Sequence, residues 1–423
     1  MFFIIRDTPV LGRVHHPWGT NKEKEKGPAT TMKADGALPP KNSVPPSSSS
    51  VLSSHLDHVR EHYNKHAAEG NHKTNIESRS QGVSYPLKRF HNNIKRALIN
   101  RFVVGDRLLD LACGRGGDIR KWFDVAVQRR GGGPFKYCKG LDLSPDEIRE
   151  AQSRYQEIKN EPRYVNTLLS CEFVTTDKLG THDVCADGDE HSYGTVSCMF
   201  AIHYFFYSET VLRQFFRNVS RHLKNRGYFI ATCPDGKRVL AELGSQDEVA
   251  KPLLRLAKKW TTPAPECFGS AFTCHIADTV VQAHEGFSEG SLEYLVFSNA
   301  LKAIAKEFDL FPVEDDWGRD LNGMFEEPRG FIRHFKPIFP SASDPSLADA
   351  SRLFQAIVLQ KRENINAKHF VAAEKYRRER KREDEMTTAT AQNKEDKEDG
   401  KRDEVDADDE EKERAPKRTK QQL

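Results

Sequence analysis

The sequence predicts an α/β fold built on a mainly parallel β-sheet with helices on both faces. Three observations lead to this prediction: short apolar runs alternate with segments of helical periodicity, a glycine-rich turn follows the first apolar run, and long polar ends flank the pattern. Strands that alternate with helices usually pair in parallel, because each helix carries the chain back to the same edge of the sheet. The folded domain is predicted at residues 55–361, between tails at 1–54 and 362–423.

The first half of this domain supplies a regular alternation of helix and strand patterns. Leu87, Phe90, Ile94 and Leu98 recur at three- and four-residue spacing, which predicts an amphipathic helix. A further helix is predicted at 119–127, and another begins at Pro145, since proline is favoured in the first helical turn. Strands are predicted at 107–112, 136–144, 171–177 and 195–201, with a break at the glycine-rich residues 131–134.

The second half continues the alternation and adds an irregular stretch. Helical periodicity marks 209–223, and an apolar run marks a strand at 227–234. The pattern between 244 and 290 is mixed, which predicts an insertion containing strand pairs. Residues 291–308 are predicted as a helix, and residues 352–361 as the last strand.

Both ends of the chain have the composition of disordered segments. Residues 1–54 are rich in Pro, Gly, Ser and Lys and show no apolar period. Residues 362–423 hold 17 Lys and Arg and 18 Asp and Glu. The apolar residues that remain are too few for their burial to offset the conformational entropy lost on folding. The basic clusters at 375–382 and 416–420 leave two interpretations open: RNA contact or nuclear import, and a solvated tail without a partner.

The composition excludes several classes of protein. No run of about 18 apolar residues predicts a membrane span, and the apolar start of the chain is too short for a signal peptide. The eight cysteines contain no C-x-x-C pair and favour reduced thiols in an intracellular protein. The spacing of Cys267, Cys274 and His275 fits no standard zinc pattern, so no metal is expected.

The motif DLACGRGGD at 110–118 joins the first predicted strand to the following helix. Its small residues allow the backbone to approach a ligand, and the start of the helix presents free amides. The motif matches neither the P-loop pattern nor the dinucleotide pattern G-x-G-x-x-G. Tight packing of strand against helix is the alternative explanation for such a turn.

Carboxylates follow the next two predicted strands. Asp142 ends the second strand, where a carboxylate can accept hydrogen bonds from both hydroxyls of a ribose. Its alternative role is to cap the helix that begins at Pro145. Asp177 ends the third strand and can accept from an adenine amino group, or can be a simple turn residue. Ligands of such sheets bind beyond the carboxyl ends of the strands, so these residues predict a ligand site there.

The motifs of this domain resemble those of the eukaryotic mRNA cap guanine-N7 methyltransferase family, which belongs to the S-adenosylmethionine-dependent class I methyltransferases. The resemblance covers about residues 58–361, and its FHNNIK, FAIHYFFYSE and EYLV elements are more specific than the glycine loop. The motifs that carry it are KRFHNNIK (88–95), LLDLACGRGGDIRKW (108–122), LDLSPDEIREAQSRY (141–155), CEFVTTD (171–177), VSCMFAIHYFFYSE (196–209), LKNRGYFIATCPD (223–235) and LEYLV (292–296).

This resemblance implies a fold, an activity and a cellular setting. The fold is a Rossmann-like, seven-stranded, mainly parallel sheet with a cap-binding insertion and disordered tails. The activity is transfer of the methyl group of S-adenosylmethionine to N7 of the GpppN cap guanine of nascent mRNA, by in-line displacement without a general base or a metal. The setting is mRNA capping in the nucleus, with capped mRNA as substrate and RNA guanylyltransferase, triphosphatase and RNA polymerase II as partners, and no membrane.

The resemblance also assigns site residues by position. The positions that hold the cofactor are Lys95, Asp110, Ala112, Gly114, Asp142, Asp177, Met199 and Tyr204. Those that hold the cap or its phosphates are His91, Asn92, Arg115, Lys121, Arg154, His203, Glu293 and Phe354. The catalytic set is His203, Tyr204 and Glu293.

The chemistry of a guanine cap agrees with these roles. One carboxylate can accept from both N1–H and N2–H₂ of guanine, which suits Glu293, although a residue near a helix start could instead favour the helix dipole. The lone pair of N7 needs no general base, so catalysis rests on positioning and electrostatics. Phe200 and Tyr204 can offer aromatic surface to a methyl sulfonium, and core packing is the alternative for Phe200.

Four positions depart from the family pattern. Ala112 stands where the family has glycine, and His91 lies between the phenylalanine and the paired asparagines. Met199 replaces a commonly polar glutamine, and Phe354 replaces a tyrosine. These departures leave two other hypotheses open: a methyltransferase of the same fold that acts on a different acceptor, and a non-catalytic module that binds caps or RNA.

Overall fold

The computed structural model describes residues 56–57, 59–64, 82–128, 135–279, 281, 290–314, 321 and 344–362. All of them belong to one compact unit of the chain. The predictions for 1–54, for the chain beyond Arg362 and for the break at 131–134 lie outside the described residues. Within the described part of the chain, no helix is both long enough and apolar enough to cross a membrane.

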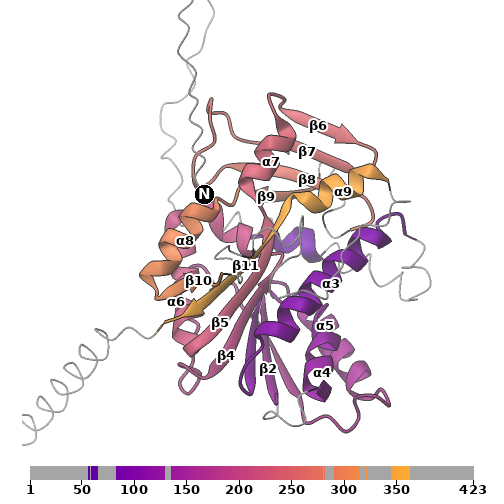
Figure 1. The fold of residues 1–423 in the computed structure, drawn as a ribbon, viewed down its shortest axis with the longest axis vertical. Coiled ribbons are helices and arrows are strands. Elements are labelled where there is room, and N and C mark those ends of the chain that lie inside the picture. The colour runs from indigo at the N-terminus through magenta and orange to yellow at the C-terminus, as the bar shows by residue number, and fades with distance from the viewer. Residues whose placement is uncertain are drawn as a thin grey trace, which may run out of the picture. The chain divides into compact units, whose positions relative to one another are not determined.

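A seven-stranded sheet forms the centre of the fold (Figure 1). Five neighbouring strands run parallel, in the order β3-β2-β1-β4-β5, and β11 is antiparallel to both of its neighbours, β5 and β10. The prediction of a seven-stranded, mainly parallel sheet is therefore confirmed. The strands are β1 (Arg107–Leu111), β2 (Tyr137–Asp142), β3 (Ser170–Thr175), β4 (Tyr193–Met199), β5 (Leu223–Pro234), β10 (Leu310–Pro312) and β11 (Phe354–Lys361).

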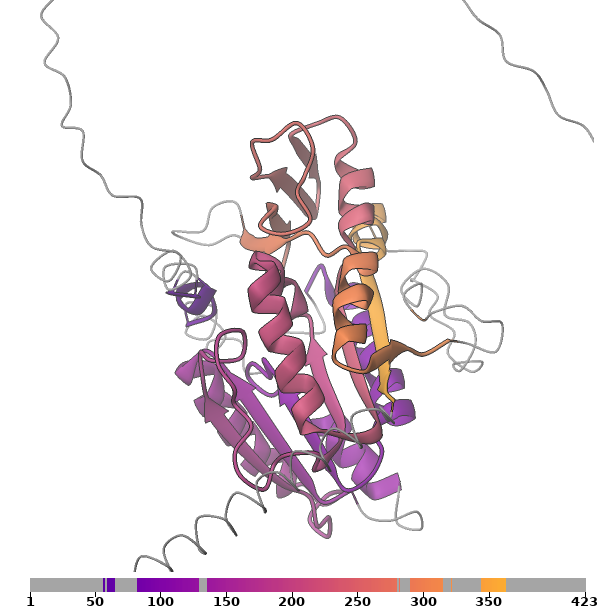
Figure 2. The ribbon, with the colours of Figure 1, turned by 90° about the vertical axis from the view of Figure 1, so that its left-hand side faces the viewer.

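Helices cover both faces of this sheet, as predicted, because successive strand residues point to opposite faces. Leu108 and Ile230 pack into the apolar cluster beneath α3, α4 and α5, whereas their neighbours Leu109 and Phe229 pack into the cluster beneath α6 and α8. Figures 1 and 2 show these two helix layers. The helices are α3 (Tyr85–Phe102), α4 (Ile119–Gln128), α5 (Pro145–Lys159), the 3₁₀ helix η1 (Ile202–Tyr207), α6 (Glu209–His222), α7 (Gly236–Leu243), α8 (Ser298–Glu307) and α9 (Pro345–Arg352).

A second, four-stranded antiparallel sheet is inserted between α7 and α8. Its strands are β6 (Glu248–Lys251), β7 (Leu254–Lys258), β8 (Ala271–Ile276) and β9 (Ser291–Tyr294), paired in chain order. This confirms the strand pairs predicted between 244 and 290. The helix predicted over 291–308 is wrong in its first part, because residues 291–294 pair with β8 and the helix begins only at Ser298.

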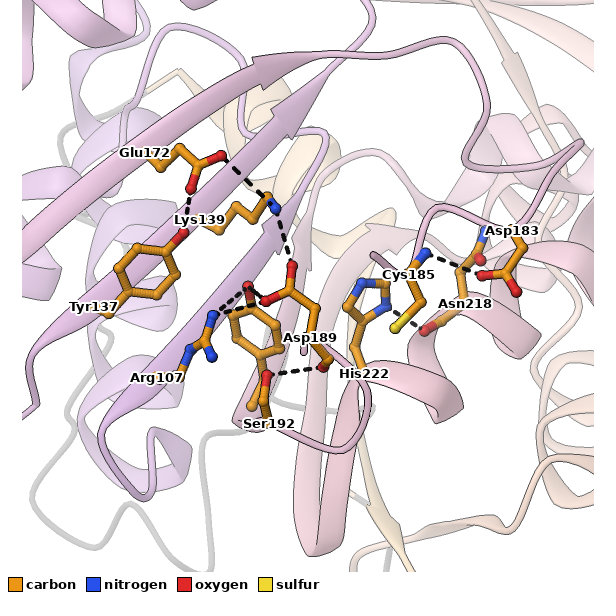
Figure 3. Close-up of polar contacts among 11 residues, drawn as sticks. Arg107, Tyr137, Lys139, Glu172, Asp183, Cys185, Asp189, Ser192, Asn218 and His222 are labelled. Atoms are coloured by element: carbon orange, nitrogen blue, oxygen red, sulfur yellow. Dashed lines mark hydrogen bonds and ion pairs between the residues drawn. The ribbon is translucent and has the colours of Figure 1, made fainter. Parts of the chain in front are cut away.

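A network of polar side chains lies toward the amino-terminal ends of the strands, opposite to the carboxyl ends (Figure 3). Asp189 Oδ1 accepts hydrogen bonds from Arg107 (2.8 Å) and Tyr193 (3.1 Å), and Oδ2 accepts one from Lys139 (3.0 Å). The Arg107 guanidinium lies 4.7 and 4.6 Å from the ring centres of Tyr137 and Tyr193. Burial alone would raise the pKa of Asp189, but the bonds from Lys139 and Tyr193 and the charge of Arg107 lower it. Through Asp189, the network thus connects the loop before β4 to Arg107 on β1 and to Lys139 on β2.

Replacing Asp189 with alanine will destabilise the fold at neutral pH. We expect Asp189→Ala to lower the free energy of unfolding by about 1–3 kcal/mol, because two partly buried cations lose their acceptor. The folded-state pKa lies below the usual 3.8, so the contribution is present above that pH and is lost as the pH falls below it. Urea titrations at pH 7 and near pH 3 will show the difference between variant and parent shrinking in acid.

The matched control is Asp187→Ala, which removes an exposed carboxylate from the same loop. Its free energy of unfolding is expected to stay within about 0.5 kcal/mol of the parent value. Equal losses for the two variants would contradict the anchoring role of Asp189.

Candidate active site

A cavity of about 260 Å³ lies at the carboxyl ends of β1, β2 and β4. β1 has β2 on one side and β4 on the other, so the turns that follow these strands diverge and leave a crevice, as in other open α/β sheets. The structure brings the eight predicted cofactor residues together in the cavity wall. They are Lys95, Asp110, Ala112, Gly114, Asp142, Asp177, Met199 and Tyr204.

The turn after β1 takes a left-handed backbone conformation at three positions. Ala112, Gly114 and Gly116 have φ angles of 58°, 52° and 72°. A Cβ atom on Gly116 would lie 2.3 Å from Cδ1 of Ile119, so a larger residue here would need the buried Ile119 side chain to shift in addition to adopting the left-handed conformation. At Ala112 the methyl group costs about 1–2 kcal/mol of strain, which explains why glycine suits this position better.

The Asp142 carboxylate connects the turns after β1 and β2. Oδ2 accepts from the Gly114 amide at 2.7 Å, and Oδ1 accepts from the Ser144 amide at 2.9 Å. The cap of α5 is Ser144, whose hydroxyl accepts from the Glu147 amide at 3.1 Å, and not Asp142. Burial raises the pKa of Asp142 to about 6. Each carboxylate oxygen keeps a second lone pair with which it can accept a ligand hydroxyl.

The Asp118 carboxylate forms ion pairs with two lysines beside the cavity. Its Oδ2 lies 2.8 Å from Lys95 Nζ, and its Oδ1 lies 2.8 Å from Lys121 Nζ. Lys121 also donates to the Gly117 carbonyl at 3.0 Å, so the structure places this predicted phosphate ligand in a buried ion pair. Burial and the charge of Asp118 raise the pKa of Asp110 to about 7. Asp118 lines the cavity although the sequence motifs did not assign it a role.

The three predicted catalytic residues converge beside the cavity. His203 and Tyr204 lie on η1, and Glu293 lies on β9. His203 Nε2 is 2.5 Å from Glu293 Oε2, and the Tyr204 hydroxyl donates to Oε1 at 3.4 Å. Tyr204 lines the cavity, whereas His203 and Glu293 are buried beside it. The alternative of a helix-start role for Glu293 is wrong, since the residue belongs to a strand.

Three aromatic rings form a cluster that reaches the cavity through Phe200. The His91 ring stacks on Phe200 with centres 5.4 Å apart and meets Phe354 edge-on at 5.1 Å. Burial and then the charge of Lys95 lower the pKa of His91 to about 3, so its imidazole is neutral at physiological pH. Two predicted cap residues, His91 and Phe354, therefore present ring surface rather than charge.

The other predicted cap residues differ in their position. Arg115 lines the cavity and forms a two-point ion pair with Glu147, at 2.8 and 3.2 Å. Asn92 is exposed on α3 and donates to the Lys88 carbonyl at 2.9 Å. Arg154 pairs with a glutamate one turn away on α5 and is not part of the cavity wall. The structure therefore brings Arg115 to the cavity, but neither Asn92 nor Arg154.

Residues of the helical segment 59–64 line part of the cavity, which the sequence motifs did not indicate. Arg60 Nη2 lies 3.6 Å from Asp177 Oδ2, and the hydroxyls of Tyr63 and Tyr204 are 2.9 Å apart. Leu56, Val59 and Tyr63 all line the cavity, and their three- and four-residue spacing was the signal available in the sequence. Among the described residues, no group of three or more His, Cys, Asp or Glu side chains could hold a metal ion.

The family model of the mRNA (guanine-N(7))-methyltransferase domain matches residues 48–323. The chain belongs to this family. Membership confirms the resemblance inferred from the motifs, and it implies S-adenosylmethionine as the methyl donor.

Relatives carry the same family name. The chain is 29% identical to mRNA cap guanine-N(7) methyltransferase 1 of Oryza sativa, over 56% of this chain and 61% of that protein. It is 32% identical to the mRNA cap guanine-N(7) methyltransferase of Saccharomyces cerevisiae, over 66% of this chain and 62% of that protein. The chain thus spans about three fifths of the length of these curated relatives. Among solved structures, it matches an S-adenosylmethionine-dependent methyltransferase from Clostridium acetobutylicum with 14% identity and a TM-score of 0.38, over 70% of this chain and 99% of that chain.

Replacing Ala112 with glycine will stabilise the protein. The left-handed φ of 58° strains an alanine but not a glycine, and the relief exceeds the extra entropy of glycine in the unfolded chain. We expect Ala112→Gly to raise the free energy of unfolding by about 0.5–1 kcal/mol, measured by chemical denaturation.

Ala151 in the middle of α5 is the matched control, because glycine in a helix interior costs about 1 kcal/mol. The two alanine-to-glycine changes should therefore have opposite signs. Destabilisation by both would refute the strain assigned to Ala112.

Proposed function

We propose that the chain is an mRNA cap guanine-N7 methyltransferase that transfers the methyl group of S-adenosylmethionine to N7 of the GpppN cap guanine. One observation carries the proposal: Tyr204 lines the cavity that holds the predicted cofactor residues and also donates to the buried carboxylate of Glu293. Tyr204 therefore connects the cavity proposed for the cofactor nucleoside with a carboxylate that can accept hydrogen bonds from guanine.

The residues of the cavity fit S-adenosylmethionine. Asp142 offers two lone pairs to the ribose hydroxyls, and the Asp177 side chain, 52% exposed, can accept from the adenine amino group. Lys95 supplies a cation for the methionine carboxylate, and its charge is only partly balanced because Asp118 is shared with Lys121. When bound, the cofactor supplies an electrophilic methyl group on a cationic sulfur. The rings of Phe200 and Tyr204 can stabilise such a cation.

Glu293 is the proposed receptor for the guanine edge. Its carboxylate can accept from N1–H and N2–H₂, and such charge-assisted bonds are the stronger class. His203 Nε2 lies 2.5 Å from Oε2. Neither ring nitrogen of this buried histidine makes a hydrogen bond within the described residues, so Nδ1 can serve the cap. N7 lies on the opposite edge of guanine and attacks with its own lone pair. The chain therefore orients the two reactants and need not remove a proton.

The remaining cap contacts are part of the same proposal. Arg115 is placed to meet the triphosphate, and Lys121 contributes its charge from within its ion pair with Asp118. The rings of His91 and Phe354 offer stacking surface, and Asn92 and Arg154 would contact the cap or its RNA from outside the cavity wall. Membership of the family supports capped mRNA as the partner. The proposal extends to cooperation with RNA guanylyltransferase, triphosphatase and RNA polymerase II, and to a nuclear location.

The activity is tested with purified protein, labelled S-adenosylmethionine and GpppG-capped RNA. We expect 7-methylguanosine after nuclease digestion, and none when the cap is already methylated. Methylation of another acceptor but not of the cap would favour a different substrate. Loss of cofactor binding would favour the non-catalytic module.

Removing the Glu293 charge will abolish methylation without abolishing cofactor binding. We expect Glu293→Gln to lower kcat/KM for GpppG by about 100-fold or more, because an amide presents a donor to the guanine donors. Isothermal titration should give a Kd for S-adenosylmethionine within about threefold of the parent, which also shows that the variant folds. Glu248→Gln, an exposed residue of the same sheet, is the control and should keep full activity. A Glu293→Gln variant that keeps the kcat/KM of the parent would refute the guanine role.

Cofactor affinity will depend on pH through Asp142. The pKa near 6 means that this carboxylate is ionised at pH 7 and mostly protonated at pH 5. Since the ionised form is the better acceptor for hydroxyls, we expect the Kd for S-adenosylmethionine to rise about tenfold from pH 7 to pH 5. Asp142→Asn should bind more weakly at pH 7 and keep only the smaller dependence that Asp110, with a pKa of about 7, contributes in the same cavity. An unchanged pH profile in the variant would exclude Asp142 as its source.

A further inference from the structure

We propose that Tyr63 is a positioning residue that couples cofactor binding to guanine recognition. Its hydroxyl begins a chain of hydrogen-bonded side chains that runs through Tyr204 to Glu293, whose other carboxylate oxygen lies against His203. The inference rests on the proposed function, in which Tyr204 lies against the cofactor and Glu293 holds the guanine.

The links of this chain come from three separate parts of the sequence. Tyr63 lies in the helical residues 59–64, Tyr204 on η1 and Glu293 on β9. The two tyrosine hydroxyls are 2.9 Å apart, and their rings meet edge-on with centres 6.1 Å apart. The Tyr204 hydroxyl is 3.4 Å from Glu293 Oε1, and Oε2 is 2.5 Å from His203 Nε2.

The direction of the hydrogen bonds follows from the number of protons. A carboxylate only accepts, so Tyr204 uses its single hydroxyl proton toward Glu293. In that arrangement Tyr204 accepts from Tyr63, whose hydroxyl donates, and it also accepts from the Ser291 hydroxyl, which lies 3.3 Å away. The O–H dipoles of both tyrosines therefore point toward Glu293, and successive hydrogen bonds polarise one another. Removing the Tyr63 hydroxyl therefore weakens the hydrogen bond from Tyr204 to the Glu293 carboxylate, although Tyr63 does not contact Glu293.

Burial makes this row of hydrogen-bonded side chains sensitive to the loss of the Tyr63 hydroxyl. Glu293 is 3% exposed, and burial raises the pKa of both Tyr63 and Tyr204 well above the usual 10, so both remain proton donors throughout the physiological range. In such an environment hydrogen bonds are electrostatically stronger than in water. The 3.4 Å link is long, and links of this kind tighten when ligands complete a site.

The same helical segment also contacts the cofactor turns. Arg60 faces Asp177 after β3, and Asn64 Oδ1 accepts from the Ser144 hydroxyl after β2 at 2.5 Å. A cofactor that contacts these turns will hold the segment against the cavity, and the segment carries Tyr63 toward Tyr204. Cofactor binding therefore favours the arrangement in which Glu293 is ready for guanine, and by linkage guanine favours cofactor binding equally.

The test measures this coupling as a binding quantity. The Kd of GpppG is determined by isothermal titration with and without saturating S-adenosylhomocysteine. In the parent protein we expect the second ligand to tighten GpppG binding by at least about fivefold, the lower range of measured couplings. Tyr63→Phe should reduce this ratio toward one while the Kd for S-adenosylhomocysteine stays within about twofold. Tyr85→Phe, a half-exposed tyrosine of α3, is the control and should keep the parent ratio.

A double variant identifies the route of the coupling. If Tyr63 acts through Tyr204, the double variant Tyr63→Phe/Tyr204→Phe should couple the two ligands no more weakly than Tyr204→Phe alone. Two results would overturn the positioning role. One is a Tyr63→Phe variant in which S-adenosylhomocysteine tightens GpppG binding as much as in the parent, and the other is a variant that loses S-adenosylhomocysteine affinity by the same factor as it loses coupling. Either result leaves the proposed function intact if the parent protein methylates GpppG, whereas failure of the parent to methylate GpppG would overturn the proposed function itself.

Discussion

The two hydrogen bonds to the Asp142 carboxylate are the constraint on which the rest of the site depends. They join the amides of Gly114 and Ser144, and so fix the turns after β1 and β2 relative to each other. The first turn needs left-handed backbone to bring Gly114 within 2.7 Å, which accounts for the strain at Ala112. The second turn caps α5 through Ser144, whose hydroxyl also reaches Asn64. One carboxylate therefore shapes the cavity floor and, through Ser144, connects it to the helical segment 59–64.

The charged side chains of the site hold one another in position, and the proposed reaction does not need them to transfer a proton. Asp118 fixes two lysines, while Asp110, whose pKa rises to about 7, is only partly ionised beside it at neutral pH. His91 stays neutral, so the cluster of rings formed by His91, Phe200 and Phe354 adds no positive charge beside the cavity. The carboxylate of Glu293 is kept in place by neighbours on η1. These features suit a reaction in which the nucleophile already carries its lone pair.

The sequence predicted those parts of the site that follow from local pattern. Strand ends in a parallel sheet meet at one edge, so the strand pattern alone was enough to place Asp110, Asp142 and Asp177 together. The strand around Glu293 could not be predicted, because its apolar spacing also fits a helix and only pairing with β8 decides between them. Likewise, the role of Tyr63 depends on contacts with residues more than a hundred positions away. Family resemblance named Glu293 and His203, but only the fold shows that they touch.

The most direct test of the account is a crystal structure of the protein with S-adenosylhomocysteine and GpppG bound together. We expect the thioether beside Phe200 and Tyr204, the ribose hydroxyls on Asp142, and the guanine N1–H and N2–H₂ on the Glu293 carboxylate. N7 should point toward the sulfur. A guanine bound away from Glu293, or with N7 turned away from the sulfur, would contradict it.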